Sequence, residues 1–235
     1  MDPTLSYIGL SVLDALAVNL LILKLYRLPV RKYIFQILIF CGIIAIVSFT
    51  MRIAVGQPEW DLPIQFVLFL LFYRYTLKYR MHLSAFILGS GWSAYISLQM
   101  IIYHLTSWAG LSNNTVIFDT AGLSVYIIQI SSITVALLIS LFLWVTGRGF
   151  SFILVPPHDF FFKENYAEYG NRVAIISAAI STVTIFVTLA LLFAQLYIGI
   201  MVLSLVTFVT AYYFSDRSEA ENARKAIAQY RNKSY

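Results

Sequence analysis

Long apolar runs separated by short polar loops constrain the fold of this chain more than any other feature of its sequence. The runs cover about residues 5–25, 33–54, 62–77, 83–105 and 121–145, and a longer apolar stretch follows at 172–214. A helix needs about 20 apolar residues to cross a bilayer, and the last stretch is about twice that length. It must turn back, and we expect the turn near residues 194–197 although neither Pro nor Gly marks it. The pattern therefore predicts about seven membrane-spanning helices.

The basic residues predict how such a bundle is oriented. All but one of the 16 Lys and Arg residues fall on one side of a seven-span arrangement, and the exception is Arg52. Lys and Arg in short loops mark the cytoplasmic side of a membrane protein. We therefore expect an all-α, multi-pass bundle in the cell membrane, with its N-terminus outside and its C-terminus in the cytoplasm. Residues 1–214 are expected to form the membrane domain and residues 215–235 a cytoplasmic helical tail.

Composition agrees with a membrane domain. Hydrophobic residues make up 60% of the chain and charged residues only 11%, with a mean hydropathy of +0.80, whereas a soluble domain carries roughly 25% charged residues. The net charge of +5 arises in the loops and tail predicted to face anionic lipid headgroups. We therefore expect membrane lipids as partners and no nucleic-acid binding.

The sequence carries no motif for catalysis or metal binding. The three histidines are dispersed, and there is neither an HExxH motif nor a glycine-rich phosphate loop. Cys41 is the only cysteine, lies in an apolar run and is expected to be small, buried and inert. We expect no enzymatic activity, no metal site and no cofactor.

Asp14 is the clearest ionisable residue inside an apolar run. An acidic side chain at the middle of a span costs on the order of 2.5 to 3.5 kcal/mol on insertion scales, so it should face protein or water. Asn19 lies about one turn deeper, and Arg52 or Gln36 of the neighbouring run are candidate partners. Two interpretations stay open: a site for a proton, ion or ligand, or a buried hydrogen bond between helices.

The loops predicted to lie outside have a mild acidic bias and two tryptophans. Their candidate ligand-binding residues are Glu59, Trp60, Asp61, Trp108 and Asp119. The carboxylates favour a cationic ligand, and the tryptophans could cap a pocket. Anchoring at the membrane interface is the ordinary alternative for the tryptophans.

Two runs carry small residues at helical spacing, which lets neighbouring backbones approach closely. The fourth run contains Ala85, Gly89, Ser93 and Ser97. The sixth contains Ser177, Ser181, Thr184 and Thr188. We expect these stripes to pack within one bundle, with a homodimer interface or a moving helix contact as the alternative.

Residues 215–235 change to a charged, alanine-rich helical pattern, for which Ser215 or Asp216 is the candidate N-cap. An apolar seam with three-four-three spacing runs along it, formed by Ala220, Ala223, Ile227 and Tyr230. Such a seam is typical of a short coiled coil, although a solvated helix explains it equally well.

The layout resembles the N-terminal membrane sensor of GHKL-type receptor histidine kinases, including those that detect peptide quorum signals in Gram-positive bacteria. The resemblance rests on LYRLPVRK at residues 25–32, FYRY at 72–75 and YFSDR at 213–217. It covers nearly the whole chain as a similarity of layout and includes no diagnostic catalytic motif. The tail has no histidine and no nucleotide-binding motif, so we expect no kinase activity from this chain itself.

The resemblance implies a bacterial sensor that detects an extracellular or membrane-borne ligand, such as a peptide, and passes a conformational signal to the tail helix. It implies a cytoplasmic kinase or response regulator as partner. The alternative from another class is a small permease or an accessory subunit of a transport complex. One clear intramembrane carboxylate and the lack of an evident inverted repeat give little support to transport.

Overall fold

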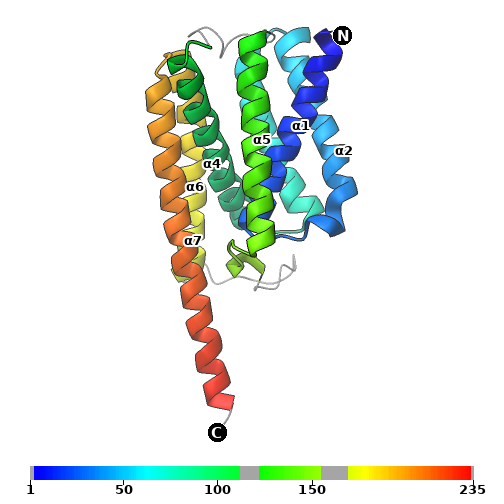
Figure 1. Ribbon diagram of the computed structural model, residues 1–235. Coiled ribbons are helices and arrows are strands. Elements are labelled where there is room, and N and C mark those ends of the chain that lie inside the picture. The colour runs from blue at the N-terminus through cyan, green and yellow to red at the C-terminus, as the bar shows by residue number, and fades with distance from the viewer. Residues whose placement is uncertain (1–2, 112–121, 155–168, 234–235) are drawn as a thin grey trace.

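The computed structural model describes residues 3–111, 122–154 and 169–233, and this part of the chain is all helical (Figure 1). Its α-helices are α1 (Pro3–Leu25), α2 (Val30–Phe49), α3 (Asp61–Leu71), α4 (Met81–Trp108), α5 (Leu123–Thr146), α6 (Tyr169–Phe193) and α7 (Tyr197–Lys233). π-helical turns at Thr50–Ala54 and Phe72–Thr76 extend α2 and α3, and short 3₁₀ turns lie at Pro58–Trp60 and Phe152–Leu154.

Five helical segments in the described part are long and apolar enough to cross a membrane. They are Thr4–Leu25, Val30–Ala54, Met81–Trp108, Leu123–Thr146 and Tyr197–Arg224. α6 adds a shorter apolar stretch at Ala178–Phe193. The predicted all-helical, multi-pass membrane class is therefore confirmed at this level, because several helices meet the length and hydropathy that a bilayer requires.

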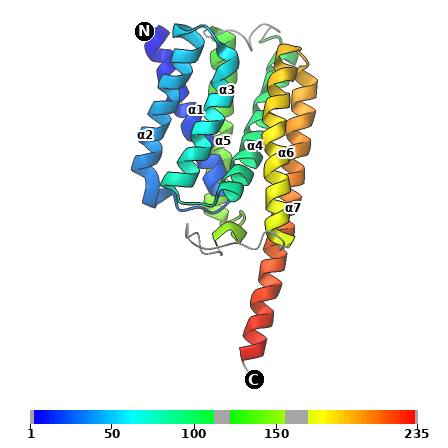
Figure 2. The ribbon, with the colours of Figure 1, turned by 180° about the vertical axis from the view of Figure 1, so that it is seen from behind.

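The helices run side by side, and α4 lies at the centre of the bundle (Figures 1 and 2). It contacts α1, α3, α5, α6 and α7, while α1 also packs on α2 and α5. The N-terminus and the α6–α7 turn lie at one end of the bundle, and α7 projects from the other (Figure 1). We call the end with the N-terminus the cavity end and the end from which α7 projects the tail end.

The long apolar stretch turns back within the predicted region, between α6 and α7. Gln195 takes a left-handed φ of 56°. The amide of Leu196 donates to the carbonyl of Leu191 at 2.9 Å, and the amide of Gln195 donates to Leu192 at 3.0 Å. These two bonds form a Schellman motif, which usually places glycine at the left-handed position. The turn thus forms without the residue that normally signals it.

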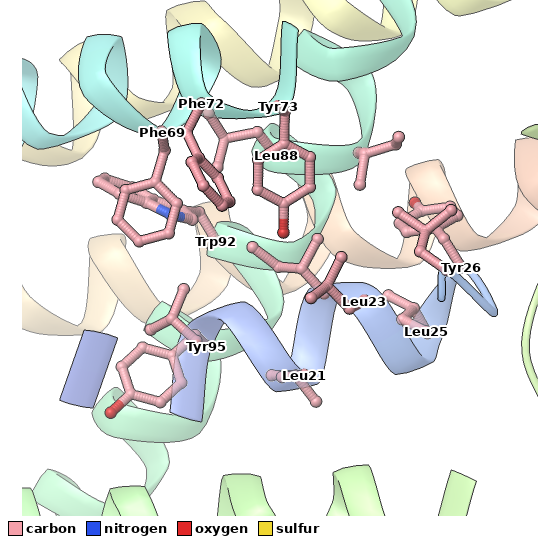
Figure 3. Packing of buried hydrophobic residues seen from close by; sticks show 14 of the residues in the cluster. Leu21, Leu23, Leu25, Tyr26, Phe69, Phe72, Tyr73, Leu88, Trp92 and Tyr95 are labelled. Atoms are coloured by element: carbon pink, nitrogen blue, oxygen red, sulfur yellow. The ribbon is translucent and has the colours of Figure 1, made fainter. Parts of the chain in front are cut away.

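Aromatic and aliphatic side chains fill the space between α1, α3 and α4 (Figure 3). Phe69 and Trp92 meet edge to face with ring centroids 5.5 Å apart. Asn19 is fully buried deeper in this core and donates to the carbonyl of Ala15 at 3.1 Å, while the Tyr73 hydroxyl lies 3.5 Å from its side-chain oxygen. Asn19 is therefore part of a hydrogen-bonded contact between helices.

Both stripes of small residues include contacts between helices of this chain. Gly89 lies directly against Ser181 of α6, where a Cβ on the glycine would be 2.1 Å from the serine Cβ. Ser97 donates to Ser204 of α7 at 3.0 Å. Thr184 shares a hydrogen bond of 3.0 Å with Thr207. Small side chains thus let α4, α6 and α7 approach closely. Ala85 is half-buried and Ser93 buried, and the side chain of Ser177 lies outside the described part.

The tail continues α7 without a break. Ser215 is fully buried within this helix and donates to the carbonyl of Ala211 at 2.8 Å. It therefore lies in mid-helix, as does Asp216, and neither caps a new helix as the change in composition had predicted. A single continuous helix joins the bundle to the projecting segment (Figure 1).

Candidate functional site

A cavity of about 300 Å³ lies between the helices at the end of the bundle that carries the N-terminus. All seven α-helices or their extensions contribute to its wall. Its polar lining residues are Tyr7, Ser11, Asp14, Ser48, Arg52, Asp61, Gln65, Tyr95, Gln99, Tyr103, Gln129 and Thr188. The polar residues that are scattered along the apolar runs in sequence are therefore gathered around one space.

Asp14 reaches the cavity from α1, on the same helical face as Tyr7 and Ser11. The hydroxyl of Tyr95 on α4 donates a hydrogen bond to its Oδ1 atom. Its other oxygen, Oδ2, has no hydrogen bond with a residue of the described part. The structure thus pairs Asp14 with Tyr95, whereas Arg52 bonds elsewhere and Gln36 is exposed.

An ion pair closes another side of the cavity. Asp61 is the first residue of α3 and only 1% exposed, and its Oδ2 accepts from Nε of Arg52 at 2.5 Å. Ser48 of α2 donates to the same oxygen at 3.0 Å, and Gln65 donates to Oδ1 at 2.6 Å. The hydroxyls of Ser48 and Tyr7 lie 3.0 Å apart, which brings α1 into the network. Every oxygen of this buried carboxylate is satisfied, as burial of a charge requires.

The π-helical turn explains how Arg52 reaches α3. The segment Thr50–Ala54 widens the end of α2, and the chain then reverses through residues 55–60 into α3. Single π turns inside α-helices are frequent at functional sites, where the extra residue redirects a side chain. Arg52 and Asp61 are nine positions apart but meet across this reversal.

Two buried polar groups in the cavity wall have no hydrogen-bond partner among the described residues. They are Nε1 of Trp92 and Oγ1 of Thr188, on side chains only 7% and 4% exposed. Buried polar atoms in proteins are nearly always hydrogen-bonded. Both side chains line the cavity, while the two unpartnered atoms are themselves enclosed by protein.

The structure separates the predicted loop residues. Asp61 is buried in the cavity wall, whereas Glu59 is half-buried and Trp60 is 55% exposed in the turn before α3. Trp108 ends α4 and is 90% exposed, and Asp119 lies outside the described residues. Of the four described members of that set, only Asp61 lines the cavity.

The remaining predicted residues lie on the projecting part of α7. Ala220, Ala223 and Ile227 are exposed, and the side chain of Tyr230 lies outside the described part. The predicted seam is therefore uncovered within this chain where it is described. Within the described residues, no three His, Cys, Asp or Glu side chains gather as a metal site would require.

The sequence pattern did not group Asp14 with the other polar residues of the cavity wall, which include Tyr7, Ser11, Tyr95, Gln65, Gln99 and Gln129. Tyr7 and Ser11 lie on the same face of α1 as Asp14, so helical spacing could have grouped these three. The other four residues come from helices other than α1, and no spacing along one helix joins them to Asp14. Tyr95 lies at the middle of its apolar run and the others lie toward the cavity end of theirs. Ordering polar residues by distance from the predicted outer end of each run would have brought them together.

At the tail end, Glu219 of α7 holds the segment that follows α5. Its carboxylate accepts from the amides of Ser151 and Phe152 at 2.7 and 2.9 Å, and from the Ser151 hydroxyl at 2.5 Å. The amide of Phe150 in turn donates to the carbonyl of Leu25 at the end of α1, at 2.8 Å. We call these contacts the tail clamp, since they tie α1, α5 and α7 together.

The chain was compared with protein-family models, with curated proteins and with solved structures, and none of the three comparisons gave a match. Its function has therefore to be inferred from the cavity and from the helices that connect it to the tail.

Proposed function

We propose that this chain is a membrane-embedded sensor that binds a ligand in the cavity and passes a conformational change to the projecting part of α7. The observation that carries the proposal is the continuity of α7. Ile200 of this helix lines the cavity, and the same helix runs without interruption to Lys233. A change in packing around the ligand can therefore move the tail directly.

The distribution of charge supports an orientation with the cavity outside and the tail in the cytoplasm. Lys24 and Arg31 lie at the tail end, over the ring of Trp144 at 5.4 and 5.8 Å from its centre. Arg52 is the basic residue in the cavity wall. Basic residues and interfacial tryptophan together are typical of the cytoplasmic boundary of a membrane protein. In this proposal all seven α-helices span the membrane and the ligand enters from outside.

Signalling of this kind needs two arrangements of the helices to which the ligand binds with different affinity. The cavity wall includes residues from α1, α4 and α7, and the tail clamp joins α1, α5 and α7 at the opposite end. A ligand that alters the spacing of these helices would therefore change the strain on the clamp. The exposed seam of α7 is the surface on which a second copy or a cytoplasmic kinase would pack.

Distance measurements between spin labels test this coupling without any ligand. Labels are attached to Arg148→Cys and Arg224→Cys, both exposed, in a Cys41→Ser background. Ser11→Trp fills part of the cavity, and Leu13→Trp places the same side chain on the outward face of α1, where Leu13 is 47% exposed. We expect the distance distribution to shift with Ser11→Trp and to stay unchanged with Leu13→Trp. A spin-label distance distribution that stays the same with both substitutions would refute the proposal.

A small permease is the second candidate, and the position of Asp14 in the cavity favours it. A carboxylate within a span is a typical element of a proton or ion path. Two results together would favour the permease over the sensor. They are solute flux into proteoliposomes that is lost with Asp14→Asn, and a spin-label distance that does not change with Ser11→Trp.

A further inference from the structure

The charges in the cavity wall define a class of ligand. We propose that the cavity binds a small molecule with a protonated amine on an apolar body, and that its ammonium group contacts Asp14. This inference rests on the proposed function only in taking the cavity as the ligand site.

Asp14 makes no ion pair with a described residue: the charge of Arg52 acts on it, but Arg52 is in contact with Asp61. The other two charged lining residues, Arg52 and Asp61, form a pair with each other. Tyr95 donates a neutral hydrogen bond to one oxygen of Asp14, and Oδ2 is bonded to no described residue. A carboxylate enclosed by protein is stabilised by an opposite charge in contact with it. An ammonium group supplies that charge together with several N–H donors.

The rest of the wall suits the body of an organic cation better than a bare metal ion. Phe69, Trp92, Tyr103 and Tyr7 line the cavity together with aliphatic side chains such as Val18 and Ile44. Aromatic faces attract ammonium groups, and they also pack against apolar carbon. The volume of about 300 Å³ lies at the lower end of the range for small-molecule sites. A longer amine, such as a peptide, could place only its terminal amine and adjoining atoms inside.

The unpartnered wall atoms add a second requirement. Oγ1 of Thr188 can donate or accept a hydrogen bond, whereas Nε1 of Trp92 can only donate. An oxygen acceptor can accept from both atoms, so we choose a probe that carries one in addition to its amine. Tyramine has this combination of a primary ammonium, an aromatic body and a hydroxyl, and we choose it as the probe.

Fluorescence of Trp92 reports binding directly. Replacing the other three tryptophans by phenylalanine, as Trp60→Phe, Trp108→Phe and Trp144→Phe, leaves Trp92 as the only tryptophan of the four. The purified chain in lipid nanodiscs is titrated with tyramine and with N-acetyltyramine, which has the same body but no charge. Trialanine amide and its N-acetylated form serve as the peptide arm. We expect a saturable change with the charged probe and binding at least about tenfold weaker for its neutral analogue, equivalent to about 1.4 kcal/mol.

Variants at Asp14 connect the preference to this carboxylate. Asp14→Asn should remove the discrimination between charged and neutral probes, and Asp14→Glu should retain part of it. Glu59→Gln, in the turn outside the cavity wall, is the matched control and should bind like the parent. Thermal unfolding of each variant shows whether it is folded. If Asp14→Asn does not fold, the partial retention of discrimination by Asp14→Glu still tests the inference.

Three results would overturn the inference: equal binding of charged and neutral probes, no saturable binding of either amine, or a preference that survives Asp14→Asn in a folded protein. The spin-label experiment uses no ligand. A negative binding result therefore refutes the amine inference alone, and an unchanged spin-label distance refutes the sensor proposal alone. Binding of trialanine amide but not tyramine would identify a peptide terminus as the source of the amine.

Discussion

Gly89 of α4 and Ser181 of α6 approach so closely that a Cβ on the glycine would lie 2.1 Å from the serine Cβ. Glycine is therefore required here for the close approach of two helices and not for an unusual backbone angle. The contact lies among the small residues that hold α4 against α6 and α7, and it predicts how this half of the bundle responds to added volume.

Gly89→Ala should destabilise the bundle by about 1–3 kcal/mol, because the new methyl group must push α4 and α6 apart. Thermal or denaturant unfolding in detergent measures the change. Gly42→Ala on α2 is the matched control, since a Cβ there meets nothing within 4 Å. Ser181→Gly should restore part of the stability to Gly89→Ala by removing the clashing atom. Equal effects of the two alanine substitutions would contradict this account.

The ion pair between Arg52 and Asp61 should contribute measurably to stability. Since the Arg52 side chain is 37% exposed, we expect a coupling of about 0.5–2 kcal/mol, below the value for a fully buried pair. A double-mutant cycle with Arg52→Gln and Asp61→Asn measures this term apart from the lost contacts to Ser48 and Gln65. Strictly additive effects of the two substitutions would show that the pair contributes nothing.

Glu219→Gln should loosen the tail clamp, because a neutral amide accepts weaker hydrogen bonds than a carboxylate. A loss of about 1.5–3 kcal/mol is expected for hydrogen bonds to a charged group. Hydrogen exchange of a peptide covering residues 148–154 should then become faster, while Asp216→Asn, an exposed change on the same helix, should leave it unaltered. Unchanged exchange in Glu219→Gln would mean that the segment is held by its aromatic contacts alone.

Cysteine labelling tests the proposed orientation. In a Cys41→Ser background, a membrane-impermeant maleimide added to intact cells should label Gln57→Cys near the cavity end and not Arg224→Cys on the tail. Permeabilised cells should allow both to react. Labelling of both positions in intact cells would place the two ends in the same compartment and remove the route by which an outside ligand could act on a cytoplasmic tail.

The helices themselves were predictable, because span length and hydropathy depend only on local sequence. The turn at Gln195 was placed in the right region by length alone, since one helix of that span would be too long for a bilayer. Its left-handed backbone was not predicted, because the stabilising Schellman bonds involve backbone atoms of any residue.

The side-chain partners in the cavity were much harder to predict. Asp14 bonds to Tyr95, which is 81 positions away, because α1 and α4 pack together in three dimensions. Asp61 was predicted to lie in a loop outside the membrane, whereas it is the first residue of α3 and is buried against Arg52. Short-range patterns give helices and their ends, whereas the choice of which faces meet depends on the packing of the whole bundle.

Because α7 is unbroken, a tilt of this helix inside the bundle would displace its far end. From Tyr197 to Lys233 the helix has 37 residues, or about 55 Å at 1.5 Å per residue. In the proposed sensor it would act as a lever whose fulcrum lies inside the bundle. The arm from Ile200 to Lys233 is about 50 Å long, so a tilt of about 5° at Ile200 would carry the far end sideways by about 4 Å. In the proposed sensor, a small tilt beside the cavity thereby becomes a larger displacement at the surface offered to a partner.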